Sequence, residues 1–214
     1  MERKKILIAV PCMDQIPARF AQSLVMLQSN EQTVVCFQIG SLVYHSRNDL
    51  AKRAIEMDAD FIFWLDSDMV FAPDVLERLL KHFENPDVDM VTGVYFRRVA
   101  PFSPVLFDEL KFTTPINCKF SEFEKIPKEG LFEVGACGFG CVLMRTEVAM
   151  SVQARFGNMF APIGNTGEDV AFCWRARECG YKILCDPSFS LGHVGNHVIT
   201  REYWEQINRN TEEQ

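Results

Sequence analysis

The sequence predicts an α/β protein with a mostly parallel central sheet flanked by helices. In the first 95 residues, short apolar runs alternate with segments whose apolar residues recur at helical spacing, which is the pattern of βαβ units. The run Phe61–Leu65 is apolar throughout, as in a central strand covered on both faces. The 214 residues, 48% of them hydrophobic and 24% charged, predict a single folded domain.

The elements of the first half follow from this alternation. Apolar or β-rich runs predict strands, and apolar residues gathered on one face predict helices. The predicted strands are residues 6–10, 34–39, 61–65 and 90–95, and the predicted helices are residues 18–28, 46–57 and 73–83. Because strands and helices alternate, we expect parallel strands with helices on both faces of the sheet.

The second half of the sequence is less regular. Prolines and scattered aromatic residues between positions 97 and 128 favour loops and a small antiparallel region. Residues 132–144 form a strand-like stretch interrupted by three glycines, which let a backbone approach a ligand closely. We expect a helix over 167–179, a strand over 181–185 and a last helix that begins near Thr200.

The chain is acidic, with 22 Lys and Arg against 29 Asp and Glu and a net charge of −7. This balance disfavours broad binding to nucleic acid or anionic membranes without excluding a local basic patch. The apolar runs are too short to span a bilayer, and the early Pro11 favours a first strand over a signal peptide. The eight cysteines contain no C-x-x-C pair, so we expect free thiols and a cytoplasmic location.

Two carboxylates follow the strand predicted over 61–65. Asp66 and Asp68 are separated by one residue, and ligands of open α/β sheets bind outside the carboxyl ends of the strands. Carboxylate oxygens at that edge can hold a divalent cation that bridges the phosphates of a nucleotide. The alternative is that both are turn residues ahead of the next helix.

A second acidic pair, Glu168 and Asp169, begins the helix predicted over 167–179. In one interpretation, one of these carboxylates faces the site as a general base. In the other, Thr166 is the N-cap and Asp169 closes a capping box, with both acids stabilised by the helix dipole. This segment alone leaves the two interpretations open.

His193 lies between two glycines, directly after Gly192 and two residues before Gly195, and follows a predicted strand. The glycines indicate a tight backbone around its imidazole, although a lone histidine is more often structural than a ligand. His197 is four residues further on, and Gly195 argues against a regular helix that would pair the two. We therefore expect His197 behind the site or at the surface.

In their order and spacing, these segments resemble the GT-A-fold, nucleotide-sugar-dependent glycosyltransferases, above all the large inverting family that makes polysaccharides and glycoconjugates. The matching segments are residues 6–11 (first strand and nucleotide loop), 46–51 (Ala-Arg-Asn helix start), 65–68 (Asp-x-Asp), 138–145 (glycine loop before a helix) and 167–169 with Arg175 (Glu-Asp motif). Residues 187–193 are similar to the segment of the polypeptide N-acetylgalactosaminyltransferases that ends in a metal-binding histidine. The resemblance implies a GT-A, Rossmann-like fold.

The resemblance also implies a metal site. Asp68 would bind the ion directly, His193 would be a further protein ligand, and Asp66 would support the metal or contact the ribose. A mixed set of carboxylate and imidazole ligands accepts Mn²⁺ more readily than an all-oxygen set does, so Mn²⁺ is expected first and Mg²⁺ second.

The donor and catalytic roles are carried over in the same way. Pro11 would lie against the nucleobase, Arg47 would reach the nucleotide or its phosphates, and Gly138 and Gly140 would leave room for the donor sugar. Asp169 would be the catalytic base, and Glu168 would orient acceptor or donor hydroxyls.

Two departures from the family pattern affect specificity. Many relatives have a carboxylate near the end of the second strand that reads the nucleobase, and here the segment is Phe-Gln-Ile-Gly at residues 37–40. An amide such as that of Gln38 can still donate to and accept from a uracil or guanine edge. The Glu-Asp pair favours inversion, whereas the likeness around His193 is to retaining enzymes.

The leading hypothesis is a metal-dependent glycosyltransferase that moves a sugar from a UDP- or GDP-sugar to an acceptor hydroxyl, with inversion and Asp169 as base. Residues 1–95 would bind the nucleotide sugar and metal, and residues 96–214 would bind the acceptor and supply catalysis. The acceptor could be a glycan, a lipid-linked sugar, a protein, a small molecule or a modified nucleobase. The alternatives are a non-catalytic nucleotide-sugar or glycan binder on the same scaffold, and a nucleotidyltransferase, against which the lack of glycine in residues 11–19 counts.

Overall fold

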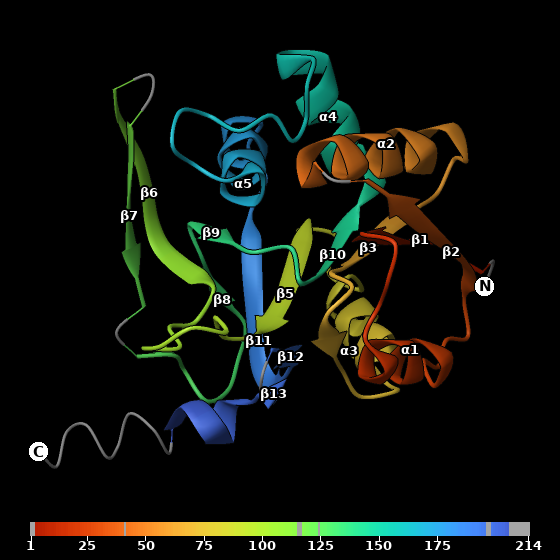
Figure 1. Cartoon of the computed structure of the whole chain (residues 1–214). Coiled ribbons are helices and arrows are strands. Elements are labelled where there is room, and N and C mark those ends of the chain that lie inside the picture. Colours follow the sequence, from red (N-terminus) through yellow and green to blue (C-terminus); the bar gives the residue numbers. More distant parts are fainter. Residues whose placement is uncertain (1–2, 41, 115–116, 124, 196–197, 206–214) are drawn as a thin grey trace, which may run out of the picture.

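The computed structural model describes residues 3–40, 42–114, 117–123, 125–195 and 198–205 (Figure 1). Its centre is a seven-stranded sheet in the order β2-β1-β3-β10-β5-β11-β8. The strands are β1 (Lys5–Cys12), β2 (Gln32–Ile39), β3 (Phe61–Leu65), β5 (Met90–Val94), β8 (Phe132–Glu133), β10 (Cys141–Arg145) and β11 (Ile183–Ser190). The predicted α/β class with a mostly parallel sheet is therefore confirmed.

One strand in the middle of the sheet runs against its neighbours. Strand β1 pairs in parallel with both β2 and β3, and β5 pairs in parallel with β11. Strand β10 lies between β3 and β5 and is antiparallel to both, with Cys141 opposite Leu65 and Val142 opposite Thr92. The residues directly before β10 thus lie beside the carboxyl end of β3, so they reach the edge where β3 ends.

Helices cover both faces of the sheet, and each face has its own apolar core (Figure 1). The helices on one face are α2 (Val43–Glu56), α4 (Thr146–Phe156) and α5 (Glu168–Glu178), and those on the other are α1 (Ala18–Val25) and α3 (Val75–His82). All five residues of β3 are buried, because its side chains point alternately into the apolar core on one face and the core on the other. The apolar run over 61–65 is thus a central strand, as expected.

Two small antiparallel sheets complete the fold. One has the order β7-β6-β9, from β6 (Leu106–Thr114), β7 (Asn117–Glu122) and β9 (Ala136–Cys137). The other has the order β13-β12-β4, from β4 (Met69–Val70), β12 (Gly192–Val194) and β13 (Val198–Ile199). The first is the antiparallel region expected from the second half of the sequence.

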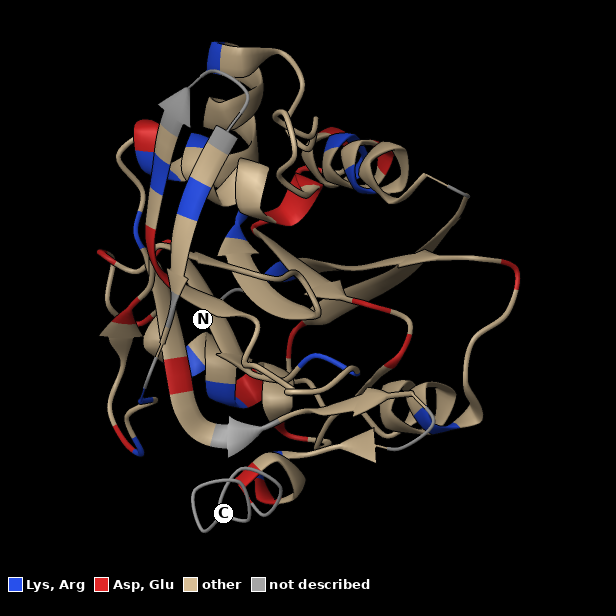
Figure 2. Ribbon diagram, turned by 60° about the vertical axis from the view of Figure 1, so that its left-hand side comes forward, with Lys and Arg blue, Asp and Glu red and all other residues tan. Residues whose placement is uncertain are grey.

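The element bounds differ from the expected ones at a few ends. Helix α3 begins at Val75, after Pro73, and β11 continues to Ser190 past the expected end, with a register shift after Asp186. The last predicted helix is present from Arg201 to Glu205, the end of the described chain, and His197 lies outside the described residues. In the described residues, no helix is long and apolar enough to cross a membrane. Acidic and basic segments are interspersed over the view in Figure 2.

A buried asparagine holds the loop before α5 in place. The side-chain oxygen of Asn48, on α2, accepts hydrogen bonds from the backbone N–H groups of Met159 and Phe160, both at 3.1 Å. The Asn48 amide group donates to the carbonyl of Tyr44 at 2.6 Å. This loop leads into the first turn of α5, so Asn48 fixes where the acidic pair of that turn begins.

We expect Asn48→Ala to lower the free energy of unfolding by about 2–4 kcal/mol, because it leaves two buried N–H groups without an acceptor. Chemical denaturation measures the change. Asn85→Ala is the matched control, since the Asn85 side chain also accepts a backbone N–H, that of Asp87 at 3.0 Å, but in an exposed place. If Asn48→Ala lowers the free energy of unfolding no more than the control does, Asn48 does not hold this loop in place.

Candidate active site

The polar residues singled out in the sequence converge at the carboxyl ends of the parallel strands. Asp66 follows β3 directly, and its backbone N–H donates to the carbonyl of Gly140, just before β10, at 3.1 Å. The Met69 N–H donates to the Asp66 carbonyl at 3.1 Å, which closes a tight turn that contains Asp68. Segments 66–68 and 138–140 are thereby held side by side.

Arg47 is the centre of a buried ion-pair network. Its Nη2 lies 2.8 Å from Oδ1 of Asp66, and its Nε lies 3.2 Å from Oε1 of Glu168. The Arg47 residue is 2% exposed, and its guanidinium lies against the rings of Trp64 and Phe139, 5.7 and 5.3 Å from their centroids. The network therefore joins α2, the end of β3 and the first turn of α5 through one rigid planar cation.

Three carboxylates act on this single cation. Burial lowers the pKa of Arg47, but the charges of Asp66, Glu168 and Asp169 outweigh that effect and raise its pKa above the ordinary value. Burial raises the pKa of Asp169 to about 6, with Glu168 adding to the rise and Arg47 opposing it. A carboxylate with a pKa near neutrality is suited to taking up a proton at physiological pH.

The first turn of α5 is not closed by a capping box. The N-cap is Gly167, no side chain caps the helix, and the Asp169 carboxylate accepts the N–H of the adjacent Val170 at 2.7 Å. A Cβ on Gly167 would lie 2.9 Å from Oδ1 of Asp169. Any other residue at this position would therefore crowd the Asp169 carboxylate. The capping-box interpretation of Thr166 and Asp169 is therefore wrong, because the helix begins one residue later than it requires.

Asp68 and His193 come together although 125 positions separate them. Strand β12 pairs with β4 so that His193 lies opposite Met69, and the Val194 N–H donates to the Asp68 carbonyl at 2.8 Å. A Cβ on Gly192 would approach Cγ1 of Val198 and the Cβ of Val70, so the close pairing requires glycine there. The result places Nε2 of His193 3.4 Å from Oδ2 of Asp68.

The hydrogen bonding of His193 suits a metal ligand. Its Nδ1 lies 2.8 Å from the Phe96 carbonyl, which can only accept, so Nδ1 carries a proton. When the ring is neutral, Nε2 then presents a lone pair toward the Asp68 carboxylate, and a divalent ion can lie between these two acceptors; when the ring is protonated, Nε2–H donates to that carboxylate directly. Metal-bound histidines typically donate their other N–H in this way. Asp68 and His193 therefore fit a divalent ion as two neighbouring ligands.

Asp66 and Asp68 have different partners. Asp66 pairs with Arg47, whereas Asp68 pairs with His193 and with Nη1 of Arg98, which lies 2.9 Å from the Asp68 Oδ2. Burial raises the pKa of Asp68, but the hydrogen bond and charge of His193 and the charge of Arg98 bring it below the ordinary value. Within the described parts of the chain, no three His, Cys, Asp or Glu side chains gather as metal ligands, so the expected third ligand Asp66 stays a prediction.

The segment with Gly138 and Gly140 packs against Tyr95, at the carboxyl end of β5. The Gly140 N–H donates to the Tyr95 hydroxyl at 3.2 Å. A Cβ on Gly138 would overlap that hydroxyl, and a Cβ on Gly140 would lie 2.8 Å from the Tyr95 ring. In this structure the space in front of both glycines is filled by the tyrosine, and their role beside a donor sugar stays a prediction.

Tyr95, Arg98 and Phe96 were not predicted as site residues. Tyr95 stacks edge-on with His193 at 5.5 Å between ring centroids, and burial raises the pKa of its phenol well above the ordinary value. Tyr95 could have been predicted as a site residue, because it ends the strand expected over residues 90–95. The contacts of Arg98 and of the Phe96 carbonyl depend on the β4–β12 pairing, which no sequence pattern indicates.

Pro11 lies in a small pocket beside this network. The pocket has a volume of about 160 Å³ and is lined by the carboxyl end of β1, the residue after β2, the start of α2 and the turn after β3: Pro11, Cys12, Met13, Gly40, Val43, Ser46 and Ser67. Ser67 lies between Asp66 and Asp68 in sequence, so the pocket reaches the turn that carries both aspartates. This is where the nucleotide-binding segment was expected.

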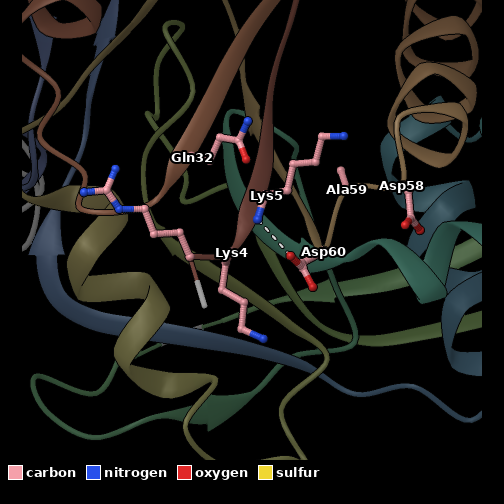
Figure 3. Close-up of a pocket in the computed structure, with 7 residues that line it drawn as sticks. Lys4, Lys5, Gln32, Asp58, Ala59 and Asp60 are labelled. Atoms are coloured by element: carbon pink, nitrogen blue, oxygen red, sulfur yellow. Dashed lines mark hydrogen bonds between the residues drawn. The ribbon is translucent and has the colours of Figure 1, made fainter. Parts of the chain in front are cut away.

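A larger cavity of about 380 Å³ lies at the opposite edge of the sheet (Figure 3). It is lined by the amino ends of β1 and β2 and by the residues before β3. Its polar groups serve the fold, since the Lys5 N–H donates to Oδ2 of Asp60 at 2.8 Å. Ligands of α/β sheets bind at the carboxyl ends, so we place the site at Asp66 and not in this cavity.

Comparison with known proteins identifies a family pattern in the chain. Residues 46–150 match the pattern of Glycosyl transferase family 2, and this segment contains Arg47, both aspartates of the β3 turn and both glycines. The resemblance to the GT-A glycosyltransferases is confirmed.

The curated relatives are longer proteins. Two proteins of Mycobacterium tuberculosis, from strains CDC 1551 / Oshkosh and ATCC 25618 / H37Rv, are named Pre-mycofactocin glycosyltransferase and are 28% identical to this chain over 152 residues. The match covers 70% of this chain and 30% of theirs, so the chain spans less than a third of their length.

Solved structures share the GT-A-like fold. The crystal structure of A197 from STIV has a TM-score of 0.66 and 19% sequence identity, over 94% of this chain and 91% of that one. The structure of GalNAc-T7 with UDP, GalNAc and Mn²⁺ has a TM-score of 0.61 and 10% identity, over 90% of this chain and 43% of that one. At these identities the likeness establishes the fold.

We expect Gly138→Ala and Gly140→Ala each to lower the free energy of unfolding by about 2 kcal/mol or more, because the new methyl group meets Tyr95. Tyr95→Phe separates the two. It removes the hydroxyl that Gly138→Ala would meet and should restore part of the loss, whereas Gly140→Ala meets a ring carbon that phenylalanine retains. Thermal unfolding of the single and double variants measures this, and equal restoration in both would contradict the assigned contacts.

Asp169→Asn should stabilise the protein at pH 8. The folded-state pKa of about 6 lies above the ordinary value of 3.8, so the charged carboxylate opposes folding. The penalty is absent below about pH 4, grows as pH rises to 6 and is complete above it. For this partly buried group we expect about 2 kcal/mol.

The control for this prediction is Asp186→Asn, which should have the opposite sign. Burial raises the pKa of Asp186, but hydrogen bonds from Ser188 and His82 bring it below the ordinary value, so its charged form favours folding. Urea denaturation of both variants between pH 4.5 and pH 8 measures the differences. A stability gain for Asp169→Asn that does not grow with pH would show that the Asp169 pKa is not raised.

Proposed function

We propose that this protein transfers a sugar from a nucleoside-diphosphate sugar to an acceptor hydroxyl, with Asp169 as the general base and with inversion at the anomeric carbon. The observation that carries the proposal is the Asp169 carboxylate, whose pKa of about 6 results from its burial next to Glu168. It lies at the carboxyl ends of the strands, where a GT-A-like fold would hold the donor.

The charge balance of the site supports a metal-dependent reaction. Four carboxylates, those of Asp66, Asp68, Glu168 and Asp169, act on two guanidinium groups, those of Arg47 and Arg98. The site thus has an excess of negative charge, and a diphosphate alone would be repelled. A divalent ion held by Asp68 and His193, Mn²⁺ first and Mg²⁺ second, would neutralise charge on the diphosphate leaving group.

The remaining donor contacts follow from the arrangement of the residues. The pocket beside Pro11 adjoins the Asp66 turn, so we assign the nucleoside to it. Asp66 is 31% exposed while its Oδ1 binds Arg47, which leaves the carboxylate accessible to a ribose hydroxyl. Arg47 itself is enclosed by its ion pairs and the aromatic rings. In this proposal it orients Asp66 and Glu168, and the expected direct contact with phosphate is less favoured by its burial.

The acceptor hydroxyl would lose its proton to Asp169. Glu168 pairs with Arg47 at 3.2 Å, and its charge raises the pKa of Asp169 beside it. The two halves of the chain share this chemistry, because Asp68 and Arg47 come from the first and His193 and the acidic pair from the second. The proposal therefore treats the described chain as one catalytic unit.

The test follows release of nucleoside diphosphate from a panel of UDP- and GDP-sugars with Mn²⁺. We expect Asp169→Asn to keep donor affinity but to slow turnover by about two to four orders of magnitude. The wild-type rate should fall as pH drops below about 6, because protonated Asp169 cannot act as a base. Glu178→Gln, at the exposed end of the same helix, is the matched control and should be unaffected. A normal rate for Asp169→Asn would remove the proposed base.

A further inference from the structure

We propose that Arg98 is a mobile cation that occupies the Asp68 carboxylate until the metal binds, and then turns to the diphosphate of the donor; this rests on the metal site proposed above. The observation behind this proposal is that Arg98 and His193 both approach the same oxygen of Asp68. Oδ2 of Asp68 lies 2.9 Å from Nη1 of Arg98, which donates to it, and 3.4 Å from Nε2 of His193. A metal ion would lie between that carboxylate oxygen and that imidazole nitrogen.

Arg98 is held far less firmly than the other charged groups of the site. Its side chain is 49% exposed, against 3% for Arg47 and 14% for His193. Its second contact is a hydrogen bond of 3.4 Å from Nη1 to the Val194 carbonyl. An ion pair this exposed is worth little, so a divalent ion that competes for the same oxygen displaces the guanidinium at small cost.

The contacts of Arg98 place the base of its side chain, while the side chain as a whole is half exposed to solvent. The aliphatic part of Arg98 passes over Gly195, where an added Cβ would lie 3.3–3.4 Å from three of its carbons. The residue is two positions beyond Phe96, whose carbonyl binds His193. The base of the side chain is thus fixed beside the metal ligands, while the guanidinium at its end can leave Asp68.

A released guanidinium would remain next to the diphosphate that the metal holds. Arginine offers paired N–H donors to phosphate oxygens, and such bonds to an anion are stronger than those between neutral groups. The competition between Arg98 and the metal for Asp68 therefore becomes cooperation once the donor is present. Arg98 would weaken binding of the metal alone and strengthen binding of the nucleotide.

The first experiment measures binding of Mn²⁺ alone, by calorimetry and by the paramagnetic resonance signal of the free ion. We expect Arg98→Gln to bind Mn²⁺ about two- to fivefold more tightly than the wild type, as the loss of an exposed competing ion pair predicts. Arg155→Gln is the matched control, since Arg155 is 51% exposed and lies 3.3 Å from the Glu178 carboxylate away from the site. It should leave Mn²⁺ binding unchanged.

The second experiment measures binding of UDP and GDP at saturating Mn²⁺. We expect Arg98→Gln to bind the preferred nucleotide about tenfold more weakly, through loss of charge-assisted hydrogen bonds. Arg98→Lys keeps the charge but not the paired donors, so it should recover only part of this affinity. Unchanged or weaker Mn²⁺ binding by Arg98→Gln, or unchanged nucleotide binding, would overturn the role of Arg98.

Asp68→Asn distinguishes failure of this inference from failure of the proposed function. If Asp68→Asn abolishes Mn²⁺ binding while Arg98→Gln has no effect, the metal site stands and the role of Arg98 is wrong. If Asp68→Asn binds Mn²⁺ as the wild type does, the proposed metal site is wrong, and the inference falls with it. Circular dichroism of each variant confirms that the fold is retained.

Discussion

A single buried cation, the guanidinium of Arg47, is the interaction on which the geometry of the site depends. It touches both the end of β3, through Asp66, and the first turn of α5, through Glu168. Burying a charge is costly unless it is paired, and here the pairing also fixes the distance between two elements that are distant in sequence. The rings of Trp64 and Phe139 close the cation off from water.

Burial and a surplus of carboxylates around Arg47 together account for the charge properties of the site. Burial raises the pKa of Asp169 to about 6, the charge of Glu168 adds to the rise, and Arg47 opposes it only in part. The same surplus makes the region attractive to cations and repulsive to a bare diphosphate. In the proposed function, this charge distribution, together with burial, favours both Asp169 as a base near neutrality and a divalent ion beside the diphosphate.

Features that depend on local chemistry could be predicted from the sequence. Features that depend on pairing between distant strands could not. The apolar run over 61–65 and the acids that follow it predicted a buried strand with carboxylates at its end, because burial on both faces leaves a local pattern. Nothing local shows that β10 enters the sheet antiparallel or that β12 pairs with β4, which brings Arg98 and His193 to Asp68. The glycines at 138 and 140 accommodate Tyr95 in this structure, and their place beside a donor sugar stays a prediction.

The pair of Asp68 and His193 depends on a segment near the end of the described chain. His193 is oriented by the Phe96 carbonyl, and the Phe96 ring is stacked on Trp204 with 5.0 Å between centroids. Trp204 belongs to the helical residues 201–205, which pack against the core on the α5 side of the sheet. Because Phe96 makes both contacts, the docking of this helix supports the direction of the His193 imidazole toward Asp68.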